Sequence, residues 1–257
     1  MASSFFTDTA VLTGRSTKHV MRSPDTIITT AVMPIAIMLL FVYVFGGAIS
    51  TDQPTGSGSY VDYVLPGILL MTVAMGVSYT AFRLFTDLKG GIFDRFHSMP
   101  IARSSVLWAH VLTSLVANLV SVAIVIGIAL IMGFHTGAGV LGWLAVAGIL
   151  LLFTLALTWI AIIAGLAASS IEGATVFSYP LIFLPFISSA FVPTASMPGP
   201  VRWFAENQPV TSIVNTIRSL FAQQPVGGEI WVSLAWCGGI SLVACAVAMM
   251  VYRKKIG

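Results

Sequence analysis

The sequence predicts an all-α integral membrane protein with six transmembrane helices, and three observations support that prediction. Apolar residues make up 57% of the 257 residues and charged residues only 8%, against about a quarter charged in a soluble domain. No Asp, Glu, Lys or Arg occurs between Ser104 and Ile171, although a spanning helix needs only about 20 apolar residues. The apolar runs are continuous rather than alternating, which favours helices over a barrel.

Polar interruptions divide this apolar sequence into six segments. The Gly-rich stretch "STDQPTGSGSY" follows the first segment, a charged stretch follows the second, and "GFHTGAG" divides the charge-free tract in two. We expect one domain, residues 1–257, with a six-helix bundle over 27–252. The predicted spans are 27–49, 63–85, two spans between 104 and 171, 174–192 and 231–252.

The basic residues predict the orientation of the chain. With six spans both termini face the same side, and all Lys and Arg residues except Arg202 and Arg218 fall on that side. Such an excess marks the cytoplasmic face, so the termini and the loop after the second span are predicted to be cytoplasmic. The net charge of +3 then reflects orientation and anionic lipid head groups, and we expect no nucleic-acid partner.

Residues 1–24 precede the first span and mix basic with apolar side chains. Arg15, Lys18 and Arg22 supply the charge, and Pro24 ends any helix there, because proline lacks the amide donor and restricts the residue before it. One interpretation is an amphipathic helix on the cytoplasmic leaflet. The alternative is a basic tail that only sets the topology.

The loop after the second span is rich in charged residues, whereas the chain as a whole contains few. Six of the 12 basic and 9 acidic residues fall within 83–103, "RLFTDLKGGIFDRFHSMPIAR". The pair Arg83 and Asp87, four residues apart, predicts that the second span continues as helix beyond the membrane until two glycines interrupt it. Residues 92–99 fit a two-turn helix that Pro100 closes. Apolar residues rimmed by charge indicate a protein contact, although a simple topology-setting loop is the alternative.

Catalytic and ion-coupling chemistry has little support in this sequence. The four histidines show no metal-ligand spacing, and no lysine stands in a G-x-x-x-x-G-K-[ST] frame. The predicted span interiors contain no Asp, Glu, Lys or Arg, which are the residues that proton and sodium relays use. We therefore expect no enzymatic activity and no cofactor in this chain. A transporter without a nucleotide-binding motif and without ionisable residues in its spans must take its energy from another chain.

The segment between the fifth and sixth spans is too polar to cross a bilayer and too apolar to extend into water. Its apolar residues recur at roughly helical spacing, with an interruption at Pro209. The pattern predicts two short helices lying at the outer membrane interface or dipping into it.

Four motifs together resemble the permease subunits of the ABC-2 class of ATP-binding-cassette transporters, close to the daunorubicin-resistance type of drug exporter. They are "RSPD" before the first span, "GGIFDRFHSMPIARSSVLWAHVL" after the second, "SSIEGA" between the fourth and fifth, and "SSAFVPTASMPGPVRWFAENQPVTSIVNTIRSLF" before the sixth. The resemblance covers nearly the whole chain. One departure is "NQPVT", which stands where the family has an Asn-Pro-like step.

The resemblance implies a role for three segments. Residues Gly91–Pro100 would be a coupling helix that docks in a groove of a separate ATPase subunit, the basic segment would rest on the same subunit, and Met197–Phe221 would be an outer helical hairpin that caps the pathway. The implied ATPase contacts are Asp87, Lys89, Gly91, Ile92, Phe93, Asp94, Arg95, Phe96, Met99 and Arg103, with Arg15, Lys18 and Arg22 on the interface helix and Pro198, Trp203, Pro209 and Arg218 on the hairpin.

The same resemblance implies an exporter in the bacterial plasma (inner) membrane. Two permeases, identical or sibling chains, would alternate access for a hydrophobic or amphiphilic drug, antibiotic, lipid or glycolipid, in contact with membrane lipids. Two copies of the ATPase would consume the ATP and magnesium. Two other functions fit the residues alone: a membrane anchor that tethers a soluble partner, and a carrier or channel that works without ATP.

Overall fold

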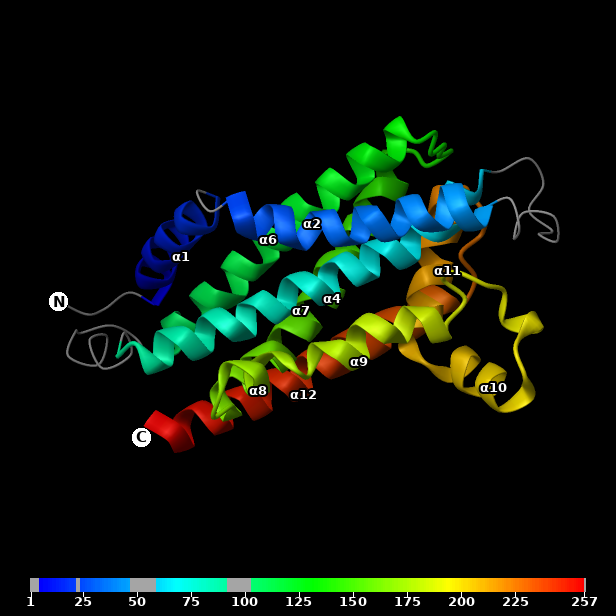
Figure 1. Ribbon diagram of the computed structural model, residues 1–257. Helices are drawn as coiled ribbons and strands as arrows, with labels where there is room; N and C mark the ends of the chain where they lie inside the picture. The colour runs from blue at the N-terminus through cyan, green and yellow to red at the C-terminus, as the bar shows by residue number, and fades with distance from the viewer. Residues whose placement is uncertain (1–4, 22–23, 47–58, 92–102, 257) are drawn as a thin grey trace.

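The computed structural model describes residues 5–21, 24–46, 59–91 and 103–256, and helices dominate these ranges (Figure 1). Within these described ranges, four helices are long and apolar enough to cross a membrane, and each corresponds to a predicted span. The elements in chain order are α1 (Phe5–Met21), α2 (Pro24–Leu39), the π-helix η1 (Leu40–Phe45), α4 (Tyr60–Lys89), α6 (Arg103–Ile131), α7 (Val140–Ala167), α8 (Ile171–Thr175), α9 (Ser178–Phe183), the 3-10 turns η3 (Leu184–Ile187) and η4 (Thr194–Ser196), α10 (Gly199–Asn207), α11 (Pro209–Phe221) and α12 (Glu229–Ile256).

The first and fifth predicted spans differ from the simple helices that hydropathy suggests. The first continues from α2 into the π-helix η1. The fifth is divided into α8, α9 and η3, because Pro180 and Pro185 each remove a backbone donor within it. These two segments are the shorter apolar runs Thr30–Phe45 and Ile171–Ile187. Four of the described helices have the length and composition of a membrane span, so the total of six spans stays a prediction.

Helix α4 lies at the centre of the bundle and contacts α2, α6, α7, α8, α9 and α11. Its start is fixed by a capping box in which Ser59 and Asp62 satisfy each other's backbone amides. It continues to Lys89, as the Arg83–Asp87 spacing predicts, and ends at Gly90. Gly91 then adopts a φ of +68°, a conformation that glycine tolerates and other residues resist.

The long helices approach α4 closely where glycines face small or polar neighbours. A Cβ built on Gly76 would lie 2.1 Å from Oδ1 of Asn118 on α6, and one on Gly165 of α7 would lie 2.9 Å from the carbonyl oxygen of Ala81. Nearby hydroxyls join the same three helices: Thr80 of α4 donates to Ser114 of α6 at 2.9 Å, and the hydroxyl oxygens of Ser114 and Thr158 of α7 are 3.0 Å apart. Small residues and interhelical hydrogen bonds are the means by which helices associate in lipid, so α4, α6 and α7 form one packed body.

Replacing Gly76 with alanine is expected to lower the free energy of unfolding by about 1–3 kcal/mol, the usual cost of forcing extra volume into a packed core. Gly148 of α7 is the matched control because a Cβ there meets nothing within 4 Å. Gly148→Ala should be neutral or slightly stabilising through helix propensity. Thermal unfolding in detergent compares the two variants, and an equal midpoint for both would contradict the close packing of α4 on α6.

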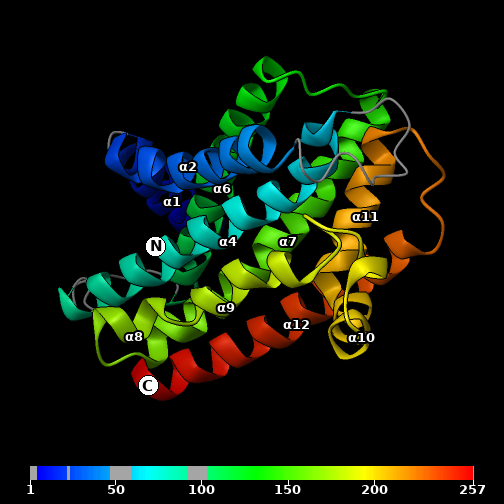
Figure 2. The ribbon, with the colours of Figure 1, turned by 45° about the vertical axis from the view of Figure 1, so that its right-hand side comes forward.

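The bundle has two distinct ends. Helix α1, the Lys89 end of α4 and the C-terminal end of α12 lie together at one end, and α10 and α11 lie at the other (Figures 1 and 2). The first end carries Arg15, Lys18, Lys89 and the run Arg253–Lys255, and we call it the basic end. The grouping of both chain ends with these residues agrees with the predicted positive-inside pattern.

Candidate functional site

A groove runs between α2, α4 and the broken segment α8–α9. Its volume is about 570 Å³. The broken segment lies against α4 through a hydrogen bond from the hydroxyl of Ser178 to that of Ser78, at 3.0 Å. The lining residues are Thr30, Met33, Met75, Ser78, Tyr79, Phe82, Thr175, Ser178, Tyr179 and Ile182.

The groove offers hydroxyls, thioethers and aromatic rings, and none of its lining residues is charged. Such a surface contacts apolar bodies while holding a few hydrogen-bonding groups, which is the usual composition of small-molecule sites. Met33 is 56% exposed and Tyr179 is 59% exposed, so the two sides of the groove are apolar surfaces open to their surroundings. The arrangement suits an uncharged or amphiphilic molecule rather than an ion.

Sequence reasoning did not single out Ser178 or Tyr179. These two residues stand directly before Pro180, where α9 begins after a turn at 176–177. The signal that could have found them is the pair of prolines within an apolar segment, because broken helices leave polar groups facing a cavity.

The predicted ATPase contacts are only partly within the described residues. The core of the expected coupling helix, with Ile92, Phe93, Asp94, Arg95, Phe96 and Met99, lies outside them. Its two flanks are described: Asp87, Lys89 and Gly91 end α4 and its turn, and Arg103 begins α6. Asp87 is paired with His110 of α6, with 3.4 Å between the carboxylate and Nε2, so the two helices that lead into and out of the loop are braced together at its base.

The basic N-terminal segment is a helix over residues 5–21, α1. It packs against α6. The hydroxyl oxygens of Thr9 and Thr13 are buried, whereas Arg15 and Lys18 are exposed. Arg22 lies outside the described residues. The exposed basic face of α1 is thus available at the same end of the bundle as the Lys89 end of α4 (Figure 1).

The segment before α12 contains two short helices, α10 and α11, which meet at Gln208 and Pro209. Pro198 is the N-cap residue of α10. Gln208, the departure from the family step, donates to the carbonyl oxygen of Ile187 and, at 3.4 Å, to that of Leu184. It thereby joins the corner between the two helices to the end of the broken segment.

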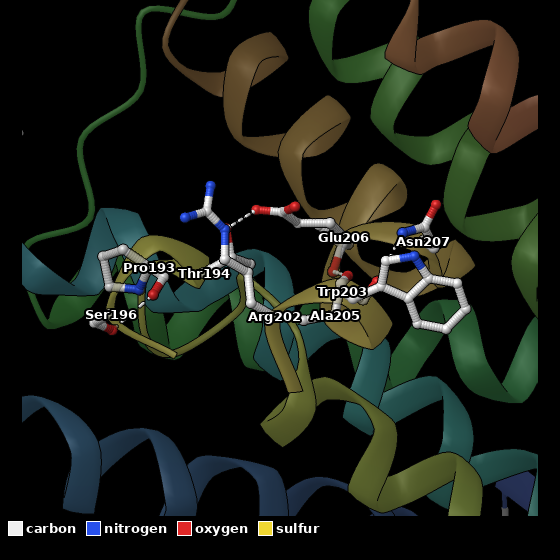
Figure 3. Close-up of polar contacts among 9 residues, drawn as sticks. Pro193, Thr194, Ser196, Arg202, Trp203, Ala205, Glu206 and Asn207 are labelled. Carbon is white, nitrogen blue, oxygen red and sulfur yellow. Dashed lines mark hydrogen bonds and ion pairs between the residues drawn. The ribbon is translucent and has the colours of Figure 1, made fainter. Parts of the chain in front are cut away.

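Helix α10 presents an exposed aromatic and a local ion pair (Figure 3). Arg202 donates to Glu206 at 2.7 Å, and Thr194 donates to the same carboxylate at 3.3 Å. The hydrogen bond from Arg202 lowers the pKa of the Glu206 carboxyl below its ordinary value. Trp203 is 69% exposed, and its indole points away from this pair (Figure 3), as expected of a side chain at a membrane interface.

Arg218 of α11 makes several polar contacts across the fold. Its guanidinium donates to the carbonyl oxygens of Ser189 at 2.9 Å and Tyr63 at 3.1 Å, and to the side chain of Asn215 at 3.1 Å. It also lies 3.9 Å from the ring centre of Tyr63. Burial lowers the pKa of Arg218, but an arginine stays charged at any physiological pH. This one side chain therefore ties α11 to the start of α4 and to the loop after η3.

These features define a multi-pass membrane protein with a charge-free groove and a helix pair at one end. Comparison with known proteins specifies the class. Residues 7–222 match the family described as ABC-2 type transporter, and the chain belongs to that family.

Curated relatives extend over most of the chain. A daunorubicin resistance ABC transporter permease protein of Streptomyces coeruleorubidus is 29% identical over 238 residues, which cover 90% of this chain and 81% of that protein. A probable doxorubicin resistance ABC transporter permease protein of Mycobacterium tuberculosis is 27% identical over 254 residues, which cover 97% and 90% of the two chains. The resemblance that the sequence motifs indicate is confirmed.

Proposed function

We propose that this chain is the membrane-spanning permease of an ATP-driven exporter, and that its cargo moves along the groove between α2, α4, α8 and α9. The main support is the uncharged groove, with its hydroxyls and aromatic rings, in a chain of the ABC-2 type transporter family. The names of the relatives, daunorubicin and doxorubicin resistance permeases, favour an amphiphilic organic cargo. They also favour a permease over a membrane anchor or a carrier that works without ATP.

We further propose that the energy comes from a separate ATPase, present in two copies, which binds at the basic end. The support is the position of Lys89, Gly91 and Arg103 around the segment 92–102, with α1 at the same end. In this arrangement the basic end, with both termini, faces the cytoplasm of a bacterial inner membrane, and α10–α11 faces outward. The Asp87–His110 pair would then transmit force from the loop to α4 and α6 together.

A second permease, identical or sibling, is proposed to cover the open side of the groove. Apolar side chains are exposed on both elements that flank it, including Val32 and Met33 on α2 and Tyr179 and Phe183 on α9. A pathway between two such faces would be enclosed by protein, whereas one face alone would leave hydroxyls such as that of Thr175 in contact with lipid. Membrane lipids would contact the remaining faces.

Replacing Ser78 with tryptophan is expected to reduce ATP-driven export by at least about tenfold, because the indole occupies the groove and blocks close approach of cargo. The measurement is efflux of doxorubicin from cells, or uptake into inverted vesicles, that contain the permease and its ATPase. Leu242→Trp on α12 is the control, since Leu242 is 75% exposed and away from the groove. Unchanged export by a stable Ser78→Trp protein would contradict the assignment of the groove.

A further inference from the structure

Three aromatic rings stack beyond one end of the groove. The ring centre of Phe41 on η1 is 4.5 Å from that of Phe191, with 23° between the planes. Phe186 of η3 lies 4.9 Å from Phe191, again at 23°, and 6.2 Å from Phe41. The groove-lining residue Met33 precedes Phe41 by eight positions on the same helical element, or about 12 Å of axial rise. Two of the elements that line the groove, α2 and α9, continue into η1 and η3, which carry two of the three rings.

Phe191 is part of a firmly held loop. Its ring is 2% exposed, and its carbonyl oxygen accepts a hydrogen bond from Tyr60 of α4 at 3.3 Å. The neighbouring Ala190 presses on α4 so closely that a Cβ on Gly67 would lie 2.5 Å from the Cβ of Ala190. Ser189 accepts from both Tyr63 and Arg218 through its carbonyl oxygen. The loop therefore belongs to the body formed by α4 and α11.

Phe41 is held in a different way. The sequence of η1 is LFVYVF, and its one polar side chain, Tyr43, is 69% exposed. The wide turn of the π-helix brings Phe41 and Phe45 together, with ring centres 5.6 Å apart, and π-helical turns occur frequently at functional sites. The contact between η1 and the loop is thus made by ring faces, which can separate and meet again without exchanging directional hydrogen bonds in lipid.

We propose that Phe41 and Phe191 are the residues that close the groove toward the α10–α11 end, and that the pathway opens when η1 moves Phe41 away from the fixed ring of Phe191. The proposal rests on the proposed function for the identity of the groove as a pathway. The closure itself is a property of this chain that can be measured without cargo or ATP.

Thiol labelling tests the closure directly. In a Cys237→Ala, Cys245→Ala background, Ser78→Cys places one thiol in the groove, and a membrane-impermeant cationic methanethiosulfonate is added from the α10–α11 side of sealed vesicles. We expect slow labelling in this parent. Adding Phe41→Ala should accelerate labelling by about tenfold, since the ring contact that favours the closed state is lost. Tyr43→Ala on the same π-helix should leave the rate unchanged.

Labelling from the basic end serves as the folding control and should be equal in all three proteins. If Phe41→Ala folds normally by this criterion and labels from the α10–α11 side no faster than its parent, the gate assignment is wrong. Equal acceleration by Tyr43→Ala would overturn it as well, because the effect would then belong to η1 in general.

Cross-linking relates the gate to transport. With the shortest bis-methanethiosulfonate that joins each pair, linking Phe41→Cys to Phe191→Cys should abolish ATP-driven export, and reduction should restore it. Linking Ser189→Cys to Asn215→Cys, whose side chains lie 2.7 Å apart in the wild type, joins two parts of the fixed body and should leave export intact. A linked Phe41–Phe191 pair that still exports cargo would refute the proposal. A complex that exports nothing before linking would count against the proposed function, whereas the labelling rates would still decide the gate.

Discussion

Replacing Arg218 with methionine is expected to lower the thermal unfolding midpoint of the detergent-solubilised protein by about 5–10 °C. The substitution keeps much of the aliphatic length but removes the hydrogen bonds to Tyr63, Ser189 and Asn215 and the contact with the Tyr63 ring. Hydrogen bonds to a charged group contribute about 1.5–3 kcal/mol each. A net loss of about 2–4 kcal/mol is therefore expected, with roughly 2–4 °C per kcal/mol for a chain of this size.

One variant separates the geometry of Arg218 from its charge, and a second variant is the control for the loss of an exposed arginine. Arg218→Lys keeps the charge but lacks the planar fork that reaches two carbonyl oxygens, so it should fall between the wild type and Arg218→Met. Arg202→Met removes a pair whose side chains are 50% and 42% exposed, and exposed pairs contribute about 0–1 kcal/mol. In a Cys245→Ala background the buried thiol of Cys237 reports unfolding to a thiol-reactive dye. Similar losses of thermal stability for Arg202→Met and Arg218→Met would show that the contacts of Arg218 with Tyr63, Ser189 and Asn215 stabilise the fold no more than an exposed ion pair does.

The position of Arg218 also explains why its predicted role was incomplete. The sequence places it in a helix near the sixth span, and α11 confirms that placement. Its partner Tyr63, however, is 155 residues away in the chain, and no local pattern encodes which carbonyl oxygen is free at the start of α4. Contacts of this kind follow from how α11 packs on α4, which is decided by the buried faces of both helices.

The same distinction holds for the spans and the groove. Helices α4, α6, α7 and α12 could be predicted, because long charge-free runs have no other stable form in a bilayer. The break of the fifth span was visible only as Pro180 and Pro185, and hydropathy averages across both. The groove combines residues from Thr30 to Ile182, so it exists only after three separate segments meet. Its lack of charge could be read from the sequence, but its location could not.

The division of the bundle into a held and a movable part follows from these contacts. Thr158 of α7 lies 3.0 Å from the Ser114 hydroxyl that also accepts from Thr80, so α4, α6 and α7 share one buried polar chain. Arg218 and Gln208 attach α10–α11 to the same body and to the end of η3. By contrast, η1 contacts the loop at Phe191 through stacked aromatic rings. Rigid-body motion against a fixed partner is a common basis of switching, and the proposed gate assigns this motion to η1.

The largest effect on transport is expected from Phe96→Asp in the loop between α4 and α6. If the loop docks in an apolar groove of the ATPase, a carboxylate at Phe96 would be desolvated without a partner, which costs several kcal/mol. Since about 1.4 kcal/mol corresponds to a tenfold change in affinity, binding of the ATPase should fall by at least about a hundredfold and export with it. Copurification of the ATPase and drug efflux are the two measurements, made on protein extracted from the membrane fraction at wild-type amounts.

Phe96→Leu is the matched control, because it keeps an apolar side chain at the same position and should retain most of the binding and export. The Asp87–His110 brace offers an independent check on how force enters the bundle. His110→Phe keeps a buried ring but cannot pair with Asp87, so the ATPase should still copurify while export falls relative to ATP hydrolysis. Normal copurification and export by Phe96→Asp would exclude the loop as the docking element. Loss of copurification in His110→Phe would instead mean that the brace shapes the docking site and does not transmit force from it.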